Sequence, residues 1–586
     1  MWPFSSNSFV QLNDLHDEYD YIVIGGGTAG CVLANRLSVN PEHSVLLIER
    51  GPAVDSWISR VPLFSASFGG SPLARKIQSV TDLVTGRPVD IYQGNGLGGT
   101  TLINSLFYTR GPAGQFDEWE RNGAEGWGSK ALLPYFIKSE SVQYEASPRA
   151  HGTKGDFIRF CALLRLRLVI GEWSNRHNTG FFYSNFQHCA DASEVLGFPH
   201  NPDVNDPDNI PVGWVRFPIT RDANGHRIST ARAFLSPGVL ATRHANLHVC
   251  PNTIVERLVL EKEGDDLIAR SVIVGPTDMK VGSEITKEVR IRGEVVLCAG
   301  AFGSPQVLLL SGIGPTEHLK EAGIPVLKDL PVGENLQDHF GVFSQYFSPL
   351  HESLLRIRHQ PLYFILQFIE YLLYGTGALL APVVQMGIFA CTALLDDVRG
   401  VPSTSKHPDK NTIPDIEIMP LAYARGLVER DRSRGGFSYL TVLLTPESKG
   451  TVRLSSTDPR ETPEIDLNYL SVPGDRERLR QGLRLSMRIA ERLMESGNIL
   501  EPAEAPKTDD DEALDAHIKD QACTTYHYSS TCAIGKVVGN DLKVKGTRNV
   551  RVADASVFPE IPAAHLQAPS VVVAEKCADM VLKAKD

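Results

Sequence analysis

The sequence contains no apolar run long enough to cross a bilayer, no cluster of lysine or arginine, and no C-x-x-C pair. A spanning helix needs about 20 predominantly apolar residues, so we expect no membrane span. The net charge of −11, without a basic run, argues against nucleic acid and anionic membranes as partners. The nine cysteines are scattered and odd in number, which argues against a disulfide framework or a metal site.

The N-terminus lacks the pattern of a signal peptide, because no basic segment precedes an apolar one. We therefore expect a reduced, cytoplasmic protein that is a monomer or a homodimer. The most hydrophobic stretch, Leu362 to Met386, is interrupted by polar residues, glycines and a proline. We interpret it as a buried or channel-lining helix followed by a loop. Residues 155–190, where arginines alternate with apolar residues before an aromatic-rich stretch, are compatible with a lid or an irregular insertion.

A dinucleotide-binding fingerprint is present near the N-terminus. An apolar strand, Tyr21 to Ile24, leads into Gly25-x-Gly27-x-x-Gly30, and a helical pattern follows. In this motif Gly25 makes the tight turn, Gly27 lets a pyrophosphate approach the backbone, and Gly30 allows close packing of the helix. Glu49 ends a second strand at the distance where a carboxylate accepts hydrogen bonds from an adenosine ribose. The chain is therefore predicted to bind a dinucleotide.

The strand–helix–strand start predicts a doubly wound α/β sheet, whose first helix offers free N–H groups to the pyrophosphate. Around 246–300 several strand patterns follow one another, as in a meander that returns to this sheet. Strand patterns recur from Phe437 to Asn468, and apolar residues recur at helical spacing from Asp475 to Met494. The length of 586 residues allows two or more domains.

Five further blocks occur in order along the chain. They are G-N-G-L-G-G-T-T-L-I-N-S-L-F-Y-T-R-G at 94–111, A-G-A-F-G-S-P-Q-V-L-L-L-S-G-I-G at 299–314, P-V-G-E-N-L-Q-D-H at 331–339, Tyr526-His527 with Thr531-Cys532, and D-A-S-V-F-P at 554–559. In these blocks the chain resembles the glucose–methanol–choline (GMC) family of flavin-dependent alcohol oxidoreductases. The resemblance implies an α/β (α+β) fold, in which a doubly wound, Rossmann-like FAD-binding sheet is joined to a substrate-binding domain of antiparallel sheet and helices.

The same resemblance divides the chain into three parts. Residues 17–330 form the FAD-binding region, and 331–540 form mainly the substrate-binding domain. Residues 541–586 return to the FAD domain and close the active site.

The resemblance implies FAD as the cofactor and a set of residues that contact it. These are Gly25, Gly27, Thr28, Ala29, Gly30, Glu49, Arg50, Gly98, Gly99, Asn104, Ser105, Leu106, Phe107, Val255, Asp554, Ala555 and Gln567. Some relatives bond FAD covalently through a histidine in the loop formed by the block at 94–111. Asn104 and Ser105 stand at that place here, so we predict noncovalent FAD. The usual arginine of the loop is replaced by Asn95, so one phosphate or loop contact of the family is not carried over.

Two histidines match the family's catalytic positions. His527 stands at the position of the base that takes the hydroxyl proton while hydride passes from the α-carbon to the flavin. Imidazole suits this role because its pKa lies near neutral pH. His565 matches the second position, which relatives fill with His or Asn and which orients the hydroxyl. The His–His pair resembles aryl-alcohol and glucose oxidases more than choline oxidase.

The surroundings of the base depart from the family pattern. Tyr528 and Ser530 replace the usual proline and glycine. Both changes are expected to stiffen or crowd the loop that carries His527. Tyr526 resembles the aromatic bottleneck of the aryl-alcohol branch. With Phe107 it favours a primary aromatic or allylic alcohol, since a sugar site needs many polar partners. The product is an aldehyde, and the acceptor is dioxygen or a quinone-like compound. Without a signal peptide, a tailoring step in secondary-metabolite biosynthesis is the favoured setting.

Other functions remain open on the same fold, because fold does not fix function. The family includes a lyase that cleaves cyanohydrins without net flavin redox chemistry, and a light-driven fatty-acid decarboxylase. The decarboxylase has no working base pair, so the two histidines argue against it. An oxidation-inactive relative that still binds FAD is a third alternative.

Overall fold

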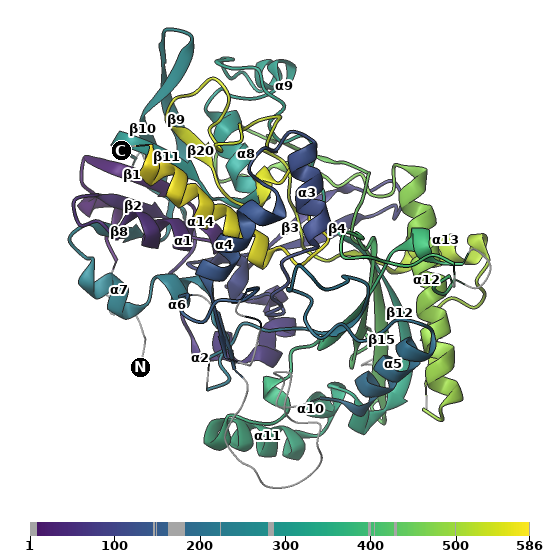
Figure 1. Cartoon of the computed structure of the whole chain (residues 1–586). Coiled ribbons are helices and arrows are strands. Elements are labelled where there is room, and N and C mark those ends of the chain that lie inside the picture. The colour runs from purple at the N-terminus through teal and green to yellow at the C-terminus, as the bar shows by residue number, and fades with distance from the viewer. Residues whose placement is uncertain are drawn as a thin grey trace.

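The computed structural model describes residues 9–584 except 144–146, 148, 157, 162–181, 223, 279–285, 397–399, 404, 427–430 and 499. Two seven-stranded sheets form its framework (Figure 1). Of the stretch 155–190, which the sequence left as a lid or an insertion, residues 157 and 162–181 lie outside the described part.

The first sheet has the strand order β8-β2-β1-β11-β10-β9, and β20 pairs with β11. The strands are β1 (Glu18–Ile24), β2 (Val45–Ile48), β8 (Leu247–Cys250), β9 (Thr253–Glu263), β10 (Asp266–Pro276), β11 (Lys287–Leu297) and β20 (Val550–Val552). The pairs among β8, β2, β1, β11 and β20 are parallel, whereas β9, β10 and β11 form an antiparallel meander. The predicted doubly wound sheet and the meander of residues 246–300 are both confirmed.

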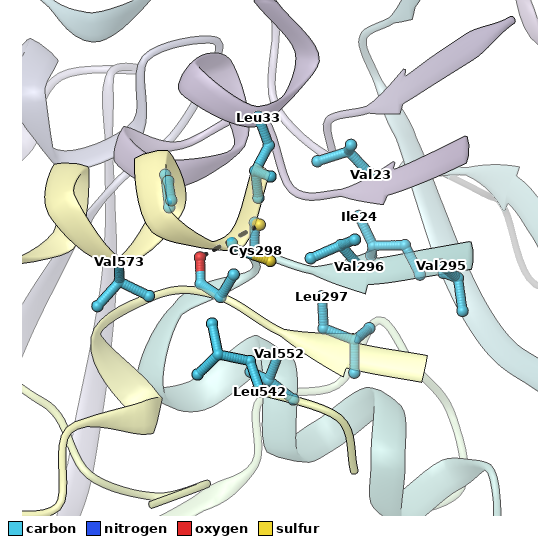
Figure 2. Packing of buried hydrophobic residues seen from close by; sticks show 14 of the residues in the cluster. Val23, Ile24, Leu33, Val295, Val296, Leu297, Cys298, Leu542, Val552 and Val573 are labelled. Atoms are coloured by element: carbon cyan, nitrogen blue, oxygen red, sulfur yellow. Dashed lines mark hydrogen bonds between the residues drawn. The ribbon is translucent and has the colours of Figure 1, made fainter. Parts of the chain in front are cut away.

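Helices cover this sheet because its central strands are apolar on both faces. Val23, Val295 and Val296 are fully buried, as expected for parallel strands enclosed on both sides. Figure 2 shows Leu33 of α1 (Thr28–Leu37) and Val573 of α14 (Gln567–Lys583) packed around them. The helices α1 and α14 lie against each other, and Arg36 pairs with the buried Glu575 at 2.6 Å. The chain's last helix thus belongs to the core that begins with its first strand.

The second sheet has the order β18-β12-β15-β14-β13-β7, and β19 pairs with β12. Its strands are antiparallel: β7 (Gly213–Arg216), β12 (Phe340–Pro349), β13 (Met386–Ala390), β14 (Ile416–Leu421), β15 (Arg434–Leu443), β18 (Glu501–Glu504) and β19 (Ala522–Thr524). The helices α5 (Ser184–Val195), α12 (Pro473–Glu495) and α13 (Asp511–Gln521) lie on the same side of the molecule as this sheet (Figure 1). Within the second sheet β7 comes from residues 17–330, so a boundary at 330 does not separate the two sheets.

The smaller elements connect these layers. They are α2 (Trp57–Arg60), η3 (Pro62–Gly70), β3 (Ala74–Thr81), β4 (Pro88–Gly94), η4 (Gly99–Leu102), α3 (Ala113–Arg121), α4 (Ser129–Ser139), β5 (Glu140–Gln143), β6 (Ile158–Cys161), α6 (Thr230–Phe234), α7 (Pro237–Thr242), α8 (Gly300–Leu310), α9 (Thr316–Glu321), α10 (Leu355–His359), α11 (Pro361–Tyr374), β16 (Thr451–Arg453), β17 (Glu464–Asp466) and the 3-10 turns at Leu12–Asp14, Leu350–Glu352, Ala378–Leu380, Thr392–Leu394 and Ala555–Val557.

The helix α11 corrects the interpretation of the most hydrophobic stretch. It is neither buried nor channel-lining, because the side chains of Leu362, Leu373 and Tyr374 are 70%, 67% and 70% exposed. The helical pattern was right and the burial was wrong: Tyr371 faces the protein while the opposite face is open. Among the helices that the structure describes, none combines the length and the apolarity needed to cross a membrane.

Candidate active site

The three fingerprint glycines meet different surroundings. A Cβ on Gly25 would lie 2.6 Å from the carbonyl oxygen of Cys298, and its φ of +102° favours glycine. A Cβ on Gly30 would lie 1.8 Å from the oxygen of Gly25. At Gly27 the nearest atom to such a Cβ is 3.9 Å away. The protein itself therefore requires Gly25 and Gly30, whereas the space beside Gly27 is free for a phosphate group.

The carboxylate of Glu49 holds the fingerprint turn together. It accepts hydrogen bonds from the backbone N–H groups of Gly26 and Gly51, both at 2.8 Å. Burial raises the pKa of Glu49, and burial lowers the pKa of the neighbouring Arg50. Val255 is buried near the start of β9. The first residue of this strand, Thr253, donates its backbone N–H to the carbonyl of Glu49 at 3.0 Å. The structure thus brings these three predicted residues to one end of the sheet.

The predicted flavin loop docks on the same turn. The N–H group of Gly98 donates to the carbonyl of Gly26 at 2.7 Å. A Cβ on Gly99 would lie 2.7 Å from the Cα of Gly27, and both loop glycines have positive φ, +105° for Gly98 and +52° for Gly99. Only residues without a side chain allow the two backbone segments to approach this closely. Thr28 and Ala29 begin α1 at this contact.

Asn104 lies at the centre of a polar chain. Its amide nitrogen donates to Gln567 at the start of α14, and its oxygen accepts from Arg227 at 2.7 Å and from the N–H of Leu106 at 3.2 Å. The buried Nε2 of Gln567 has no hydrogen-bond partner, nor do Nε and Nη2 of the fully buried Arg227. Such buried donors are rare unless a further polar group meets them. Ser105 is half-buried beside Asn104.

Asp554 ties the C-terminal segment to the helix α8. Its carboxylate accepts from the N–H of Gly300 at 2.8 Å, from the hydroxyl of Ser304 at 2.6 Å, and from the N–H of Ser556 at 2.8 Å. Burial raises its pKa. The carbonyl of Ala555 accepts the N–H of Ser530 at 3.1 Å, which links this segment to the loop of the predicted base.

The pairing of β12 with β19 positions the predicted base. His339 directly precedes β12, and His527 follows β19 by three residues. As a result the two imidazoles meet Nδ1 to Nδ1 at 2.9 Å. The backbone N–H of His527 donates to Asp338 at 2.7 Å, and burial raises the pKa of this aspartate to about 6. Sequence reasoning named His339 only as the last residue of a block and missed its contact with the base.

His565 lies beside the predicted base, with its ring centroid 5.0 Å from that of His527. Its Nε2 lies 3.2 Å from Glu417 Oε1, and its backbone N–H donates to the hydroxyl of Thr109 at 2.9 Å. The rings of Phe107 and Phe217 pack against it at 4.8 and 5.5 Å. Glu417 was not predicted; its one signal in the sequence is an acidic residue within the otherwise apolar strand Ile416–Leu421.

Burial dominates the electrostatics of the histidine cluster. It lowers the pKa of His527 well below 6.5, and the neighbouring His339 and His565 lower it further. Burial likewise lowers the pKa of His339 to about 3. Both imidazoles are therefore neutral at neutral pH, and a neutral imidazole has one nitrogen that can take up a proton.

The departures from the family pattern are accommodated locally. Tyr528 is buried, with its ring centroid 4.8 Å from that of Phe302. Ser530 is buried with a φ of +69°, a conformation that suits glycine better. Tyr526 is 43% exposed, and its ring meets the edge of Tyr92 at 5.9 Å. The expected crowding around this loop thus takes the form of a packed core at Tyr528 and of two non-glycine residues with positive φ, Tyr526 at +65° and Ser530 at +69°.

This geometry defines a class of protein: a mixed α/β protein with a Rossmann-like nucleotide-binding sheet, a second, antiparallel sheet and a buried histidine pair. Family models described as GMC oxidoreductase match residues 19–341 and 446–574. The chain belongs to the GMC oxidoreductase family. It is accordingly an FAD-dependent oxidoreductase that acts on alcohols.

Known relatives cover nearly the whole chain. An oxygen-dependent choline dehydrogenase of Photobacterium profundum is 32% identical over 584 residues, 97% of this chain and 94% of the relative. Pyridoxine 4-oxidase from Mesorbium loti has a TM-score of 0.77 at 25% identity, with 96% of this chain and 99% of that chain covered. A fungal aryl-alcohol oxidase has a TM-score of 0.78 at 22% identity over 97% and 100% of the two chains, a likeness of fold alone.

The residues present fit FAD. The space beside Gly27 can take a pyrophosphate, and the unpartnered nitrogen of Gln567 lies next to Asn104 on the flavin loop. Because Asn104 carries no imidazole and already bonds to Gln567 and Arg227, it offers no covalent attachment. Within the described residues no group of three or more His, Cys, Asp or Glu side chains could hold a metal ion.

Proposed function

We propose that this protein oxidises a primary aromatic or allylic alcohol to its aldehyde, with His527 as the base and His565 as the residue that orients the hydroxyl. The observation that carries the proposal is the 5.0 Å approach of the two imidazoles beside the rings of Phe107 and Phe217. When bound, FAD supplies the acceptor for the hydride that leaves the α-carbon. The cofactor is proposed to contact the fingerprint turn, the loop from Gly98 to Phe107, and Gln567.

The hydrogen bonds around His527 leave its Nε2 as the basic atom. The hydroxyl of Thr525 donates its hydrogen to the carbonyl of His339 at 3.0 Å, so its oxygen must accept from His527 Nδ1 at 3.2 Å. His527 Nδ1 therefore carries the hydrogen, and His339 Nδ1 accepts at 2.9 Å. A neutral imidazole protonated at Nδ1 has its lone pair on Nε2. Nε2 is then free to take the hydroxyl proton of the substrate.

His565 is held by Glu417 in a similar way. The Nε2–H of His565 donates to the buried carboxylate, which fixes the plane of the imidazole ring beside His527. Glu417 acts through His565, so we assign it a positioning role. A base and an orienting group in fixed positions reduce the entropy that the reaction must lose on reaching its transition state.

The side chains near the histidine pair favour an apolar substrate. Phe107 and Phe217 are buried, and Phe389 packs on Phe217 at 6.2 Å. A benzylic or allylic α-carbon also releases hydride more readily, because conjugation delocalises the developing positive charge. The electron acceptor in this proposal is dioxygen or a quinone-like compound, and the reaction is a tailoring step in secondary metabolism.

Choline oxidation is a second candidate, favoured by one observation. Glu417 places a buried carboxylate beside His565, and an anionic group of this kind can attract a cationic substrate. A relative named as a choline dehydrogenase matches over 97% of this chain. Against this candidate, the carboxylate is already bonded to His565, and the adjacent rings are those of phenylalanines rather than further acids.

Anaerobic bleaching of the flavin tests the proposal. The purified holoenzyme is mixed with a benzylic alcohol, glucose, choline or methanol, and the absorbance of oxidised flavin is followed. We expect the benzylic alcohol to bleach the flavin fastest, and His527→Ala to bleach slowly with its flavin content unchanged. Faster bleaching by choline or glucose would overturn the aromatic assignment. Cleavage of a cyanohydrin without bleaching would indicate a lyase, and inertness to every substrate an inactive relative.

A further inference from the structure

The outer face of α11 is apolar along its whole length. Its exposed large side chains, between 45% and 70% accessible, are Leu362, Ile365, Leu366, Ile369, Leu372, Leu373 and Tyr374. Their spacing of three and four residues places them on one stripe. The helix contains one charged residue, Glu370, whose carboxylate is bonded to Gln367 and Thr376 within the protein. No charge therefore interrupts the stripe.

The inner face holds α11 firmly in place. Phe368 meets Trp57 of α2 at 5.4 Å, and Tyr371 packs in a small core with Leu379 and Leu380. Pro361 stands in the first turn, and Gly375, with a φ of +62°, ends the helix. The exposure of the outer face is thus a property of an anchored helix. In Figure 1, α11 lies at the periphery of the molecule, beside α10.

A basic group of residues adjoins the first turn of α11. The guanidinium of Arg356 lies 3.9 Å from the ring centroid of Tyr363. Arg358, which precedes the start of α11 at Pro361, is exposed. His359 Nδ1 lies 3.1 Å from the carbonyl of Arg432, whose side chain is also exposed. Among the described residues, the acidic neighbours include Asp431, which is bonded to Ser433, and Glu352 in the turn before α10. In a chain of net charge −11, this edge is locally positive.

Two copies of the chain would not be held together by this face alone. A helix of 14 residues is about 21 Å long and about 10 Å wide, so pairing two of them buries only a few hundred Å². Stable protein interfaces bury roughly 1,200 Å² or more and are rich in aromatic residues and arginine at their centres. The stripe here is aliphatic apart from Tyr374. A convex aliphatic helix is better covered by a surface that deforms around it.

We propose that α11 docks this protein on the surface of a lipid bilayer that contains anionic lipids. The stripe enters the boundary between headgroups and acyl chains, Tyr374 lies at the headgroup level, and Arg356, Arg358 and Arg432 contact the phosphates. Apolar burial combined with a basic flank is the usual mode of interfacial helices. The proposal departs from the expectation that the net charge of −11 disfavours anionic membranes, because only charges within about a Debye length of the lipid surface count and those beside α11 include three arginines.

A series of contacts connects the docked helix with the loop of the proposed base. Phe64 at the start of η3 packs against the core beneath α11, and the end of η3 is close to Tyr92, whose ring lies 3.3 Å from the position of a Cβ on Gly69. Tyr92 in turn meets Tyr526, the residue before the base. A lipid surface at α11 is thus linked by one short element to the aromatic residues in front of His527. The inference concerns docking and is independent of which alcohol is oxidised.

Vesicle flotation of the full-length holoenzyme tests the proposal. The probes are vesicles of phosphatidylcholine and vesicles of an equimolar mixture of phosphatidylcholine and phosphatidylglycerol. We expect the wild type to float with the mixed vesicles. The double variant Ile365→Glu with Ile369→Glu should lose binding on the order of tenfold or more, because both substitutions charge the centre of the stripe. Arg358→Gln should lose about fivefold on the mixed vesicles and nothing on phosphatidylcholine, since one basic residue near anionic lipid contributes about 1 kcal/mol.

Leu83→Glu is the matched control, because Leu83 is 90% exposed in a turn outside α11. It should bind vesicles as the wild type does. All variants should keep the wild-type flavin content, melting temperature and turnover with a soluble alcohol, which separates a docking defect from misfolding. No flotation of the wild type, or equal loss in Leu83→Glu, would overturn the proposal. A wild type that instead dimerises in ultracentrifugation, with the double variant monomeric, would identify the stripe as a contact between copies.

Discussion

His339 and His527 share a single hydrogen between their Nδ1 atoms, which lie 2.9 Å apart. Thr525 settles its position, because the threonine hydroxyl already donates to the His339 carbonyl and can only accept from His527. Thr525 and His339 thus both accept from His527 Nδ1 and together hold the tautomer in which the lone pair lies on Nε2. Two residues that do not touch the substrate in this proposal thereby keep His527 able to act as a base.

Replacing the base should abolish turnover without loss of the cofactor. His527→Ala is expected to lower kcat by roughly 10²–10⁴-fold, the usual contribution of a general base. Flavin absorbance relative to protein absorbance should stay unchanged. If the variant is purified without flavin, His527 is structural and the assignment as base is wrong.

Substitutions of His339 test the tautomer argument. His339→Leu removes one of the two acceptors for His527 Nδ1–H and leaves Thr525 as the other, so kcat should fall by up to about 10-fold because the Nδ1–H tautomer is then less favoured. His339→Asn places an amide oxygen near the position of Nδ1 and should retain more activity than the leucine variant. Equal damage in both, at unchanged flavin content and melting temperature, would argue against tautomer selection.

The pH dependence of kcat/KM should lack an acid limb near 6.5. Burial lowers the pKa of His527 well below this value, so the base stays neutral, and active, as the pH falls through 6.5. Asp338, whose pKa burial raises to about 6, is the group that can produce an inflection there. Asp338→Asn is the control that removes such an inflection. A limb at 6.5 that persists both in this variant and in His565→Asn would show that His527 titrates normally.

The fingerprint glycines should respond differently to alanine. Gly30→Ala should fail to fold, because its Cβ would lie 1.8 Å from the carbonyl oxygen of Gly25. Gly27→Ala should fold, since the nearest atom is 3.9 Å away, but bind FAD weakly because the methyl group enters the proposed pyrophosphate space. Soluble yield and flavin content measure the two effects. Normal flavin content in a bulkier Gly27→Val variant would remove the pyrophosphate from this position.

Ser530→Gly should stabilise the fold. The serine has a φ of +69° in a fully buried position, and glycine adopts this conformation without the penalty of a Cβ. The expected gain is about 1 kcal/mol, less the loss of conformational restriction in the unfolded chain. Thermal unfolding of the holoprotein measures it. A lower melting temperature would mean that the contact of the Ser530 and Ser529 hydroxyls at 3.3 Å outweighs the strain.

Local patterns were sufficient to predict the nucleotide-binding sheet. Alternating glycines after an apolar strand identified the turn, and the runs at residues 246–300 identified the meander. Glu417 could not be predicted, because a single acid in an apolar strand gives no sign of the histidine that it meets 148 positions further on. His339 was visible as part of a block, but its partner depends on the register of β12 with β19.

The error at α11 has a different cause. Its sequence has the spacing of an amphipathic helix, and that spacing is the same whether the apolar stripe faces a core or the solvent. Only the position of α2 and of the turn at Ala378–Leu380 on the opposite face decides which side is covered. Hydrophobic periodicity therefore predicts the helix, while its exposure follows from tertiary packing.

Because β20 pairs with β11, the nucleotide-binding sheet can be completed only late in translation. The strand that completes the nucleotide-binding sheet, Val550–Val552, and the helix α14, whose Glu575 holds Arg36 of α1, both leave the ribosome hundreds of residues after the fingerprint. The nascent chain consequently exposes Gly25 and Gly27 long before β20 and α14 have been synthesised. The sheet that carries the fingerprint is therefore completed only by the last residues of the chain, and we expect a chain that ends before Val550 to lack both this strand and the helix that covers α1.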